Sequence, residues 1–343
     1  MPSTIETLAQ FEPVKVAVVI LNWNGKSLLE KFLPKVIAYS DTATIYVADN
    51  ASTDDSVQFL SENYPEVNII QNKINGGYAK GYNDALKNLS EDIFILLNSD
   101  VAATPDWITP VISEFEKDPQ VAAAQPKILD YNNRTHFEYA GAAGGFIDKY
   151  GFPYCRGRIF ETLEEDSGQY DDIAPIFWAS GACLFVRSEA FWQVGGFDED
   201  YFAHQEEIDL CWRLHSQNKK TIAVGTSKVY HVGGATLDAT HPQKTFLNFR
   251  NSLFNIFKNV QGPEAYVLIF MRLLFDGVAG IRFLAQGKFK HFFAIIRAHF
   301  SFYKNLPKMR AKRKKHASRN KYFSVNVIIF KYFIQNKRIF RQL

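Results

Sequence analysis

The first third of the chain alternates continuously apolar runs with segments whose apolar positions recur at helical spacing. The apolar runs are typical of buried strands and predict five of them, at residues 15–22, 44–48, 67–70, 92–97 and 121–124. The helical spacing predicts helices between them, at residues 26–39, 54–63, 77–89 and 105–117. Strands and helices that alternate in this way form parallel βαβ units with right-handed crossovers. The pattern therefore predicts an α/β fold with a mostly parallel central sheet.

The pattern changes after residue 125. Residues 130–175 hold many glycine, tyrosine and charged residues without clear periodicity, which indicates loops and short antiparallel strands. Beyond them, strands are predicted at 182–187 and 221–224, and helices at 188–194, 207–216 and 242–259. We therefore expect one α/β domain over residues 1–260, with a first half at 15–125 and a second half at 126–260.

Charge separates a tail from this domain. In the 343-residue chain, 39 Lys and Arg nearly balance 36 Asp and Glu, and the net charge is +3. Residues 261–343 alone contain 18 of the basic residues and two acids, so they carry +16 and residues 1–260 carry −13. The hydrophobic content of 47% is ordinary for a globular protein and excludes a collagen-like or wholly disordered chain. Residues 261–343 are expected to form a basic, aromatic-rich helical region.

Within this tail, the apolar residues of 287–305 follow helical spacing on one face, and a basic cluster follows at 308–315. Such a combination favours a segment lying in the plane of an anionic membrane surface. The alternative is a helical subdomain that packs on the body with its charges solvated. The most apolar stretch is interrupted by Arg272, Asp276 and Arg282, so no transmembrane span is predicted. Nucleic acid is not expected as a partner.

The cysteines and the N-terminal segment indicate the cellular compartment of the protein. The three cysteines, at 155, 183 and 211, are too few and too scattered for a disulfide framework, which indicates a reducing environment. Residues 1–11 lack the basic and apolar regions of a secretory signal. Together with the basic tail, these features predict a cytoplasmic protein that is peripheral on the inner face of the cell membrane.

Polar or glycine-rich segments follow each of the first four predicted strands. They contain Asn22, Asn24, Asp49, Asn50, Asp54, Gly76, Gly77, Lys80, Asn83, Asn98, Ser99 and Asp100. Any one of these residues has an ordinary structural explanation, as a helix cap or a turn residue. However, ligands of open α/β sheets bind beyond the carboxyl ends of the strands. Four such segments in succession therefore predict a single binding crevice.

The chemistry of this crevice suits a nucleoside diphosphate. Asp49 can accept hydrogen bonds from a base or from ribose hydroxyls. Gly76 and Gly77 allow close approach of a ligand and begin a helix whose N-terminus favours anions. Asp100 stands at the tip of a buried strand, where a carboxylate can hold Mg²⁺ or Mn²⁺ against phosphate oxygens.

A second group of polar residues lies in the other half of the domain. Glu206, Glu207 and Asp209 stand at the start of a predicted helix, behind a Gly-Gly turn and several aromatic residues. The helix dipole alone would explain acids there, but one of them can also act as a general base toward a sugar hydroxyl. His231 ends a strand further on, and we expect it to be a metal ligand because a metal site is already predicted.

These segments resemble family-2 glycosyltransferases with the GT-A fold, above all the rhamnosyltransferase-like branch that acts in bacterial surface polysaccharide assembly. The matching segments span about residues 15–235 and read VVILNWNG, VADNASTD, NGGYAKGYN, ILLNSDV, GACLFVR, GGFDEDYFAHQEEIDLCWR and VYHVGG. The resemblance implies an inverting, metal-dependent enzyme that moves one sugar from a nucleotide-diphosphate donor to a lipid-linked or cell-surface glycan acceptor. Residues 130–175 would contribute to the acceptor site.

The resemblance also implies roles for individual residues. Asp100, with Asn98 beside it, and His231 would hold Mg²⁺ or Mn²⁺. The acidic pair of the family usually reads Glu-Asp but is Glu206-Glu207 here; we favour Glu207 as the base, with Glu206 positioning the acceptor, and the choice stays open. Two further residues are candidates for contact with a phosphate or the acceptor, Asp209 and Arg250.

Two alternatives remain at this point. Asn98 replaces the first Asp of the usual metal motif, which suggests deoxythymidine-diphosphate-rhamnose as donor, but UDP-hexoses are also open. A catalytically silent, membrane-docked scaffold of a polysaccharide assembly complex would share the fold, although it would not need to retain Asp100, the paired glutamates and His231.

Overall fold

The computed structural model describes residues 13–233, 241–316 and 321–343. Three sequence predictions involve residues outside this description. They concern the N-terminal segment without a secretory signal, Gly234 of the last matching segment, and the side chains of Lys314 and Lys315 in the basic cluster.

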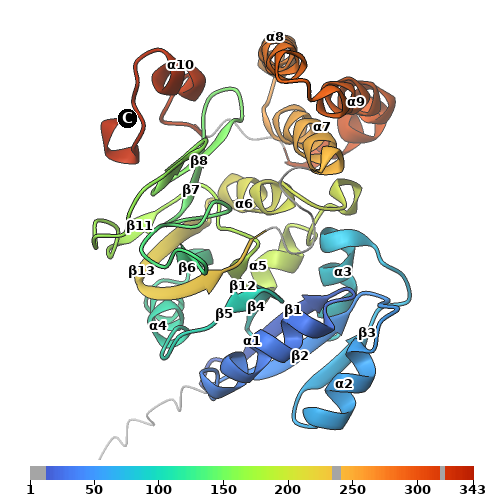
Figure 1. Ribbon diagram of the computed structural model, residues 1–343, viewed down its shortest axis with the longest axis vertical. Helices are drawn as coiled ribbons and strands as arrows, with labels where there is room; N and C mark the ends of the chain where they lie inside the picture. The colour runs from blue at the N-terminus through green and yellow to red at the C-terminus, as the bar shows by residue number, and fades with distance from the viewer. Residues whose placement is uncertain (1–12, 234–240, 317–320) are drawn as a thin grey trace, which may run out of the picture.

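A mixed sheet forms the centre of the described molecule. Its strands are β1 (Val16–Asn22), β2 (Thr44–Asp49), β3 (Asn68–Gln71), β4 (Ile93–Asn98), β5 (Val101–Ala102), β6 (Val121–Asp130), β11 (Ile173–Pro175), β12 (Cys183–Arg187) and β13 (Lys220–His231). Their spatial order is β11-β13-β6-β12-β4-β1-β2-β3, with β5 beside β13 (Figure 1). The short strand β5 was not predicted, and it is important for the site because it pairs with the last two residues of β13.

The two halves of the sheet differ in direction. Strands β1 to β4 pair in parallel, as predicted, and β6 pairs in parallel with β13. Strand β12 lies antiparallel between β4 and β6, and β11 and β5 are also antiparallel to β13. The chain reaches β12 from the irregular region after β6, so it re-enters the sheet from the opposite end. The sheet is therefore mixed, and its parallel part is the N-terminal half.

Helices cover both faces of this sheet. They are α1 (Lys26–Ala38), α2 (Ser56–Asn63), α3 (Gly77–Leu86), α4 (Thr109–Lys117), α5 (Ser188–Gln193) and α6 (Glu206–Ser216), with a short 3₁₀ turn η1 (Glu199–Tyr201). Alternate residues of β1 point to opposite faces: Val16 and Val18 pack with α1, α2 and α4, whereas Ala17 and Val19 pack with α3, α5 and α6. The continuous apolar runs of the sequence therefore reflect strands that are buried on both faces.

The irregular region forms a small antiparallel sheet, as predicted. Its strands are β7 (Gly145–Ile147), β8 (Pro153–Cys155), β9 (Arg158–Ile159) and β10 (Thr162–Leu163). The remaining helices are α7 (Pro242–Asn259), α8 (Glu264–Ala285), α9 (Phe289–His316) and α10 (Ile328–Phe333), and a 3₁₀ turn, η2 (Phe340–Gln342), ends the chain. Helices α7, α8 and α9 stand together at one end of the molecule, and α1 and α2 lie toward the other (Figure 1).

The tail packs on the body. Helix α9 lies along α7, and its buried residues Phe302 and Met309 join the main apolar core. Part of the basic cluster is occupied in this packing, because Lys308 and Lys312 form ion pairs with acids of the body and Arg313 donates hydrogen bonds to backbone carbonyls. These contacts confirm the packing alternative for this part of the cluster, and contact of the cluster with a membrane stays a prediction. No helix among the described residues is long and apolar enough to span a bilayer.

Candidate functional site

The carboxyl ends of β1 and β2 are held together by a hydrogen-bond network. Asn22 donates from Nδ2 to Asp49 Oδ1 (3.2 Å) and to Ser52 Oγ (3.3 Å), and the backbone N–H of Ser52 donates to Asp49 Oδ2 (2.9 Å). Asn24 Oδ1 accepts from the backbone N–H of Thr53 (2.7 Å). Asn22 and Asp49 are buried, and Asn22 Oδ1 has no hydrogen-bond partner among the described residues. The predicted convergence of these two strand ends is confirmed.

Asp54 is a helix-capping residue, which is the structural role that the sequence allowed as an alternative to a ligand contact. Its carboxylate accepts from the backbone N–H of Ser56 (3.1 Å) in α2 and from that of Lys26 (3.2 Å), the first residue of α1. Burial alone would raise the pKa of Asp54, but these hydrogen bonds and that of the Ser56 hydroxyl lower it below its ordinary value. Asp54 therefore fixes the two helix N-termini that flank the strand ends.

The glycine pair after β3 packs against the second half of the domain. Gly77 has φ +75°, and a Cβ there would lie 2.4 Å from the carbonyl oxygen of Phe202. The backbone N–H of Ala79 donates to the same oxygen (3.2 Å). Asn50 donates to the carbonyl of Gly77 (3.1 Å) from the end of β2. The chain's own loop therefore requires glycine at position 77, and the predicted contact of Gly76 and Gly77 with a ligand stays a prediction.

Lys80 and Asn83 contact the loop before α6. Lys80 pairs with Asp84 (3.0 Å) and Glu199 (3.7 Å). Asn83 uses both ends of its amide on the backbone of Phe197, donating to the carbonyl and accepting from the N–H at 2.9 Å each. These contacts join α3 to the loop before α6, and they occupy the polar groups that were predicted to contact a donor.

Asp100 and His231 lie in contact beside the end of β4. The pairing of β5 with β13 places them together, and His231 Nε2 lies 3.1 Å from Asp100 Oδ1 and 3.5 Å from Asn98 Nδ2. The other ring nitrogen, Nδ1, is 3.4 Å from Glu138 Oε1, which is an ion-pair distance rather than a well-formed hydrogen bond. Asp100, His231 and Glu138 are all nearly buried. Asp100 lies in the turn between β4 and β5 and His231 ends β13, so the two residues are direct neighbours and not on opposite sides of a cleft.

The electrostatics of this group suit a cation. Burial opposes protonation of His231, but the hydrogen bond with Asp100 and the negative charges of Glu138 and Asp100 raise its pKa to about 10. Burial also works against ionisation of Asp100, yet the hydrogen bond and charge of His231 lower its pKa below the ordinary value. An imidazolium held between two carboxylates carries the positive charge that a metal ion would bring, so a bound cation would displace this proton.

The donor set fits a divalent ion that is completed by its ligand. Nε2 of His231 and a carboxylate oxygen of Asp100 are both suitable for Mn²⁺ or Mg²⁺. Across the described ranges, no group of three or more His, Cys, Asp and Glu side chains is arranged to hold a metal. The remaining positions would therefore be filled by phosphate oxygens and water, as is usual for Mg²⁺.

The loop before α6 has an unusual backbone. Phe202, His204 and Gln205 all have positive φ, between 65° and 71°, although none is glycine. Such conformations are costly and persist only where surrounding contacts impose them. Asn251 of α7 supplies these contacts, since its Nδ2 donates to the carbonyls of Ala203 (2.9 Å) and His204 (2.7 Å). The strained loop ends at Glu206 and Glu207, and so it fixes where their carboxylates lie.

The two glutamates differ in environment. Glu206 is 3% exposed, its Oε2 has no hydrogen-bond partner within the described chain, and burial raises its pKa well above the ordinary value. Glu207 is only partly buried, and desolvation raises its pKa to about 7 despite opposing backbone hydrogen bonds. A base works best when its pKa lies near the working pH. The contrast favours Glu207 as the group that exchanges a proton and Glu206 as a neutral neighbour.

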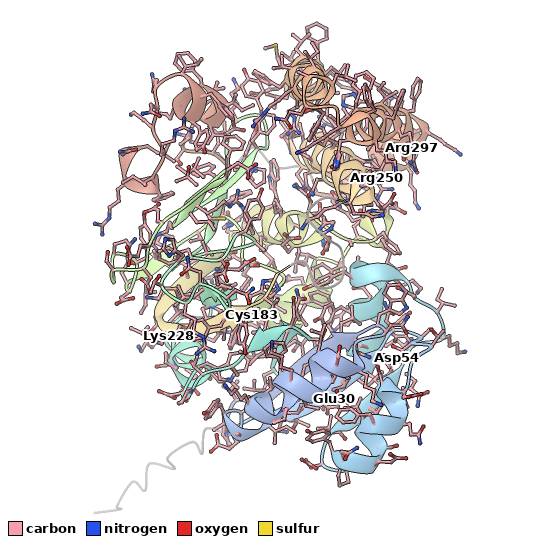
Figure 2. All side chains as sticks on the ribbon, viewed as in Figure 1. Glu30, Asp54, Cys183, Lys228, Arg250 and Arg297 are labelled. Atoms are coloured by element: carbon pink, nitrogen blue, oxygen red, sulfur yellow. The ribbon has the colours of Figure 1, made fainter. Side chains whose placement is uncertain are left out.

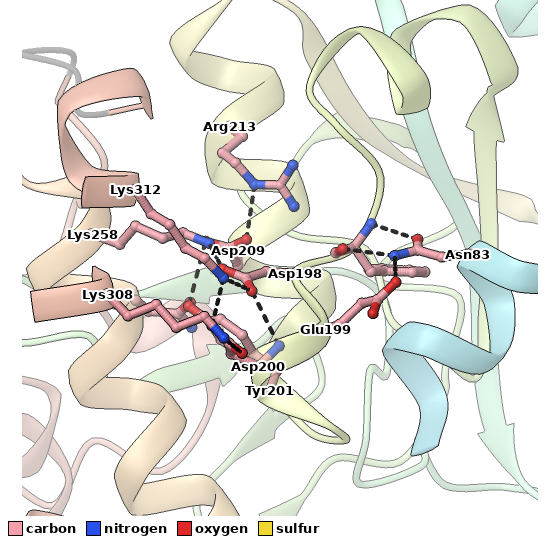
Figure 3. A network of polar contacts seen from close by, with 12 residues as sticks. Asn83, Asp198, Glu199, Asp200, Tyr201, Asp209, Arg213, Lys258, Lys308 and Lys312 are labelled. Carbon is pink, nitrogen blue, oxygen red and sulfur yellow. Dashed lines mark hydrogen bonds and ion pairs between the residues drawn. The ribbon is translucent and has the colours of Figure 1, made fainter. Parts of the chain in front are cut away.

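Asp209 is the centre of a buried ion-pair network (Figure 3). It accepts from Arg213 Nε (2.8 Å), Lys258 Nζ (2.7 Å) and Asn259 Nδ2 (3.0 Å), and it is fully buried. Burial would raise its pKa, but Lys258 and Arg213 lower it. The network corrects the prediction that Asp209 contacts a phosphate or the acceptor, because its carboxylate is enclosed and saturated.

The network continues into the tail. Asp198 pairs with Lys258 (2.7 Å) and with Lys312, and Asp200 pairs with Lys308 (2.5 Å) and Lys312 (2.6 Å). In Figure 3 these lysines approach the η1 loop from α7 and α9. The acidic loop that precedes the glutamates is therefore held by the C-terminal helices.

Arg250 also supports this loop. Its Nη2 donates to the carbonyls of Asp200 and Tyr201 at 3.0 Å each. Figure 2 shows it on α7 near Arg297 of α9, and both guanidinium groups lie over the ring of Phe246. The structure gives Arg250 this loop-holding role, and its predicted contact with a phosphate stays a prediction.

Sequence reasoning missed Glu138. It lies in the irregular region after β6, where no motif or periodicity marks it, and its Oε2 accepts from the backbone N–H of Ala140 (2.6 Å). Only the fold brings it to His231.

Comparisons with known proteins agree with this arrangement. The model of the family described as "Glycosyl transferase family 2" matches residues 17–195, more than half of the chain. The N-acetylglucosaminyl-diphospho-decaprenol L-rhamnosyltransferase of Mycobacterium tuberculosis is 30% identical over 233 residues, which cover 62% of this chain and 75% of that protein.

Solved structures with the same fold are more distant in sequence. Staphylococcus aureus TarS 1–349 in complex with UDP-GlcNAc is 14% identical, with a TM-score of 0.55, over 87% of this chain and 84% of that one. GalNAc-T7 with UDP, GalNAc and Mn²⁺ is 17% identical, with a TM-score of 0.53, over 64% of this chain and 43% of that one. These likenesses establish the GT-A fold. From the family match and the rhamnosyltransferase relative, the chain belongs to glycosyl transferase family 2 and is a glycosyltransferase.

Proposed function

We propose that this glycosyltransferase moves one sugar, with inversion and with the help of Mg²⁺ or Mn²⁺, from a nucleotide-diphosphate donor to a lipid-linked or cell-surface glycan acceptor. The observation that carries the proposal is the contact of Asp100 with His231 (3.1 Å) at the carboxyl edge of the sheet. Residues 1–260 would form the catalytic domain, with the donor bound mainly by the half at 15–125.

The donor site is proposed at the ends of β1, β2 and β4. Asn22, Asp49 and Ser99 would line it; Oδ1 of Asn22 is buried and has no hydrogen-bond partner within the described chain. Asp100 and His231 would hold the cation, with Asn98 beside them. When bound, the ion would neutralise the charge that develops on the leaving diphosphate.

Glu207 is proposed as the general base. The acceptor oxygen forms a bond to the anomeric carbon while the bond from that carbon to the diphosphate oxygen breaks, and Glu207 accepts the hydroxyl proton. With a pKa of about 7, Glu207 is partly ionised near neutral pH, and after the transfer it releases the accepted proton to solvent. Glu206, buried and neutral beside it, would help to position the acceptor without competing for that proton.

The sugar and acceptor are proposed from the relatives. The mycobacterial relative is by name a rhamnosyltransferase acting on a diphospho-decaprenol lipid, and Asn98 in the metal motif agrees with deoxythymidine-diphosphate-rhamnose as donor. UDP-hexoses are the alternative. We further propose that residues 261–343 attach the enzyme peripherally to an anionic membrane surface, where a lipid-linked acceptor would be found.

A thermal-shift screen of nucleotide sugars with Mn²⁺ or Mg²⁺ tests the proposed activity. A donor at about 100 times its Kd should stabilise the fold by about 2.7 kcal/mol, and only when the cation is present. The stabilising donor should then release nucleoside diphosphate slowly in water and faster with an acceptor. Stabilisation without any turnover would indicate the silent scaffold, and no stabilisation by any donor would contradict the proposal.

Glu138 is proposed to orient His231 toward the cation. Replacing Glu138 with Gln should weaken Mn²⁺ binding about tenfold, because carboxylates that hold a metal-binding histidine typically contribute 10- to 100-fold to affinity. Isothermal titration with Mn²⁺ and nucleoside diphosphate measures this directly. Glu164 of the same region is a matched control, because it is similarly buried but bonds to Tyr170 (3.0 Å) instead. Equal affinities of wild type and Glu138→Gln would refute the role.

A further inference from the structure

Helix α8 has charged residues on its buried side and apolar residues on its exposed side. Its buried side carries two charged residues: Arg272, which donates to the carbonyl of Tyr150 (2.9 Å), and Asp276, which pairs with Arg272 (3.3 Å) and with His299 of α9 (3.0 Å). Between residues 265 and 281, every exposed residue is apolar or glycine. Amphipathic helices of soluble proteins have the opposite arrangement.

The exposed side forms one continuous surface, which we call the α8 face. It consists of Tyr266, Val267, Phe270, Leu274, Val278 and Ile281, which are 51–67% exposed. At about 100° per residue these positions fall within roughly one third of the helix circumference. Contiguous apolar patches of this kind on soluble proteins mark sites of interaction. Within the described chain the ring of Tyr266 packs against Phe257 of α7, and the other five side chains of the α8 face are more than half exposed.

Aromatic and basic residues of α9 extend this surface. Phe289, Phe293 and Phe300 are 58–72% exposed, and a hollow of about 360 Å³ between α8 and α9 is lined by apolar residues such as Leu273 and Ile296. Exposed basic residues occur along the same two helices and the turn between them, namely Arg282, Lys288, Lys290, Arg297 and Lys304. An apolar face with a basic rim is the signature of a surface that inserts shallowly into an anionic bilayer.

We infer that the α8 face, with the adjoining aromatic residues of α9, is the surface that docks on an anionic lipid bilayer. This inference rests on the membrane attachment proposed above. It makes the α8 face, and not the basic cluster at 308–315, the main determinant of that attachment. Lys308 and Lys312 are already paired with Asp198 and Asp200. A second copy of the chain fits less well, because a two-fold interface would bring the basic rims of both copies together.

Sedimentation with vesicles of phosphatidylglycerol and phosphatidylethanolamine tests the assignment on the full chain. Wild type should partition onto these vesicles and not onto phosphatidylcholine. Val278→Asp should lower the partition coefficient at least tenfold, whereas Ile173→Asp, which places the same charge on an exposed apolar site of β11, should leave it within about twofold. Donor turnover without vesicles should be the same in both variants, which shows that they are folded.

Charge variants separate the two basic regions. The double variant Lys288→Gln/Lys290→Gln should lose about 30-fold in partitioning, since each basic residue near an anionic surface contributes roughly fivefold. Lys308→Gln/Lys312→Gln should lose less than about threefold. Binding of wild type that is unaffected by Val278→Asp would overturn the α8 assignment alone. No binding of wild type to any vesicle would overturn the membrane attachment itself, as would a wild-type dimer that Val278→Asp dissociates.

Discussion

Replacing Asp100 with Asn is expected to lower kcat/KM for sugar transfer about 1000-fold. The substitution removes the one carboxylate that contacts His231 Nε2, and a metal that stabilises a leaving diphosphate contributes several kcal/mol to the transition state. Steady-state release of nucleoside diphosphate, at saturating Mn²⁺ and in Mn²⁺ titration, measures the loss. Added Mn²⁺ should restore only part of the activity.

The control for Asp100→Asn must distinguish a loss of catalytic activity from a loss of folding stability. Asp100 contributes an ion pair to the fold, so its removal should also lower the free energy of unfolding slightly at pH 7. Asp118→Asn also removes an ion pair, the 2.7 Å contact with Lys220, but this pair is solvent-exposed and remote from the site. It should lose little stability and no activity. If Asp118→Asn and Asp100→Asn retained the same turnover, Asp100 would have no role in the reaction.

Replacing Glu207 with Gln is expected to lower kcat 100- to 10,000-fold while leaving donor affinity unchanged, because a general base contributes this much to the chemical step. In wild type, activity should rise as pH increases through about 7, where Glu207 loses its proton. The residual activity of the variant should lack this rise. A pH profile of kcat for both proteins, with donor Kd from calorimetry, gives the comparison.

The pH dependence of folding stability provides the control for Glu207→Gln. Its pKa is raised in the folded protein, from an ordinary 4.5 to about 7, so its ionisation favours the unfolded chain. The stability that Glu207 contributes is complete below pH 4.5 and is lost as pH rises through 7. Glu207→Gln should therefore be as stable as wild type at low pH and more stable at pH 8. A variant that is inactive at pH 8 through unfolding would contradict this assignment.

Much of the fold could be predicted because its signals are local. The apolar run at 15–22 became β1, and the helical spacing at 242–259 became α7 with the same bounds. The direction of β12 could not be predicted from local pattern, because a single buried strand has the same sequence whether its neighbours are parallel or antiparallel.

The site was predictable where a residue follows a strand. Asp100 and His231 each stand at a strand end, and the fold brings them into contact. Glu138 and the pairs of Lys308 and Lys312 depend on segments far apart in the sequence, and no local pattern marks them. Helix α8 shows the same limit, since helical spacing reveals two faces but not which of them is buried. Two of its charges, Arg272 and Asp276, lie on the inner face.

The most direct test of the account is the coordination of Mn²⁺ by His231, followed by pulsed electron paramagnetic resonance with nucleoside diphosphate present. We predict one Mn²⁺ per chain whose spectrum shows modulation by an imidazole nitrogen. The modulation should disappear in His231→Gln, and Asp100→Asn should weaken binding at least tenfold. Mn²⁺ that binds both variants as tightly as wild type, without nitrogen modulation in any of them, would contradict the proposed site.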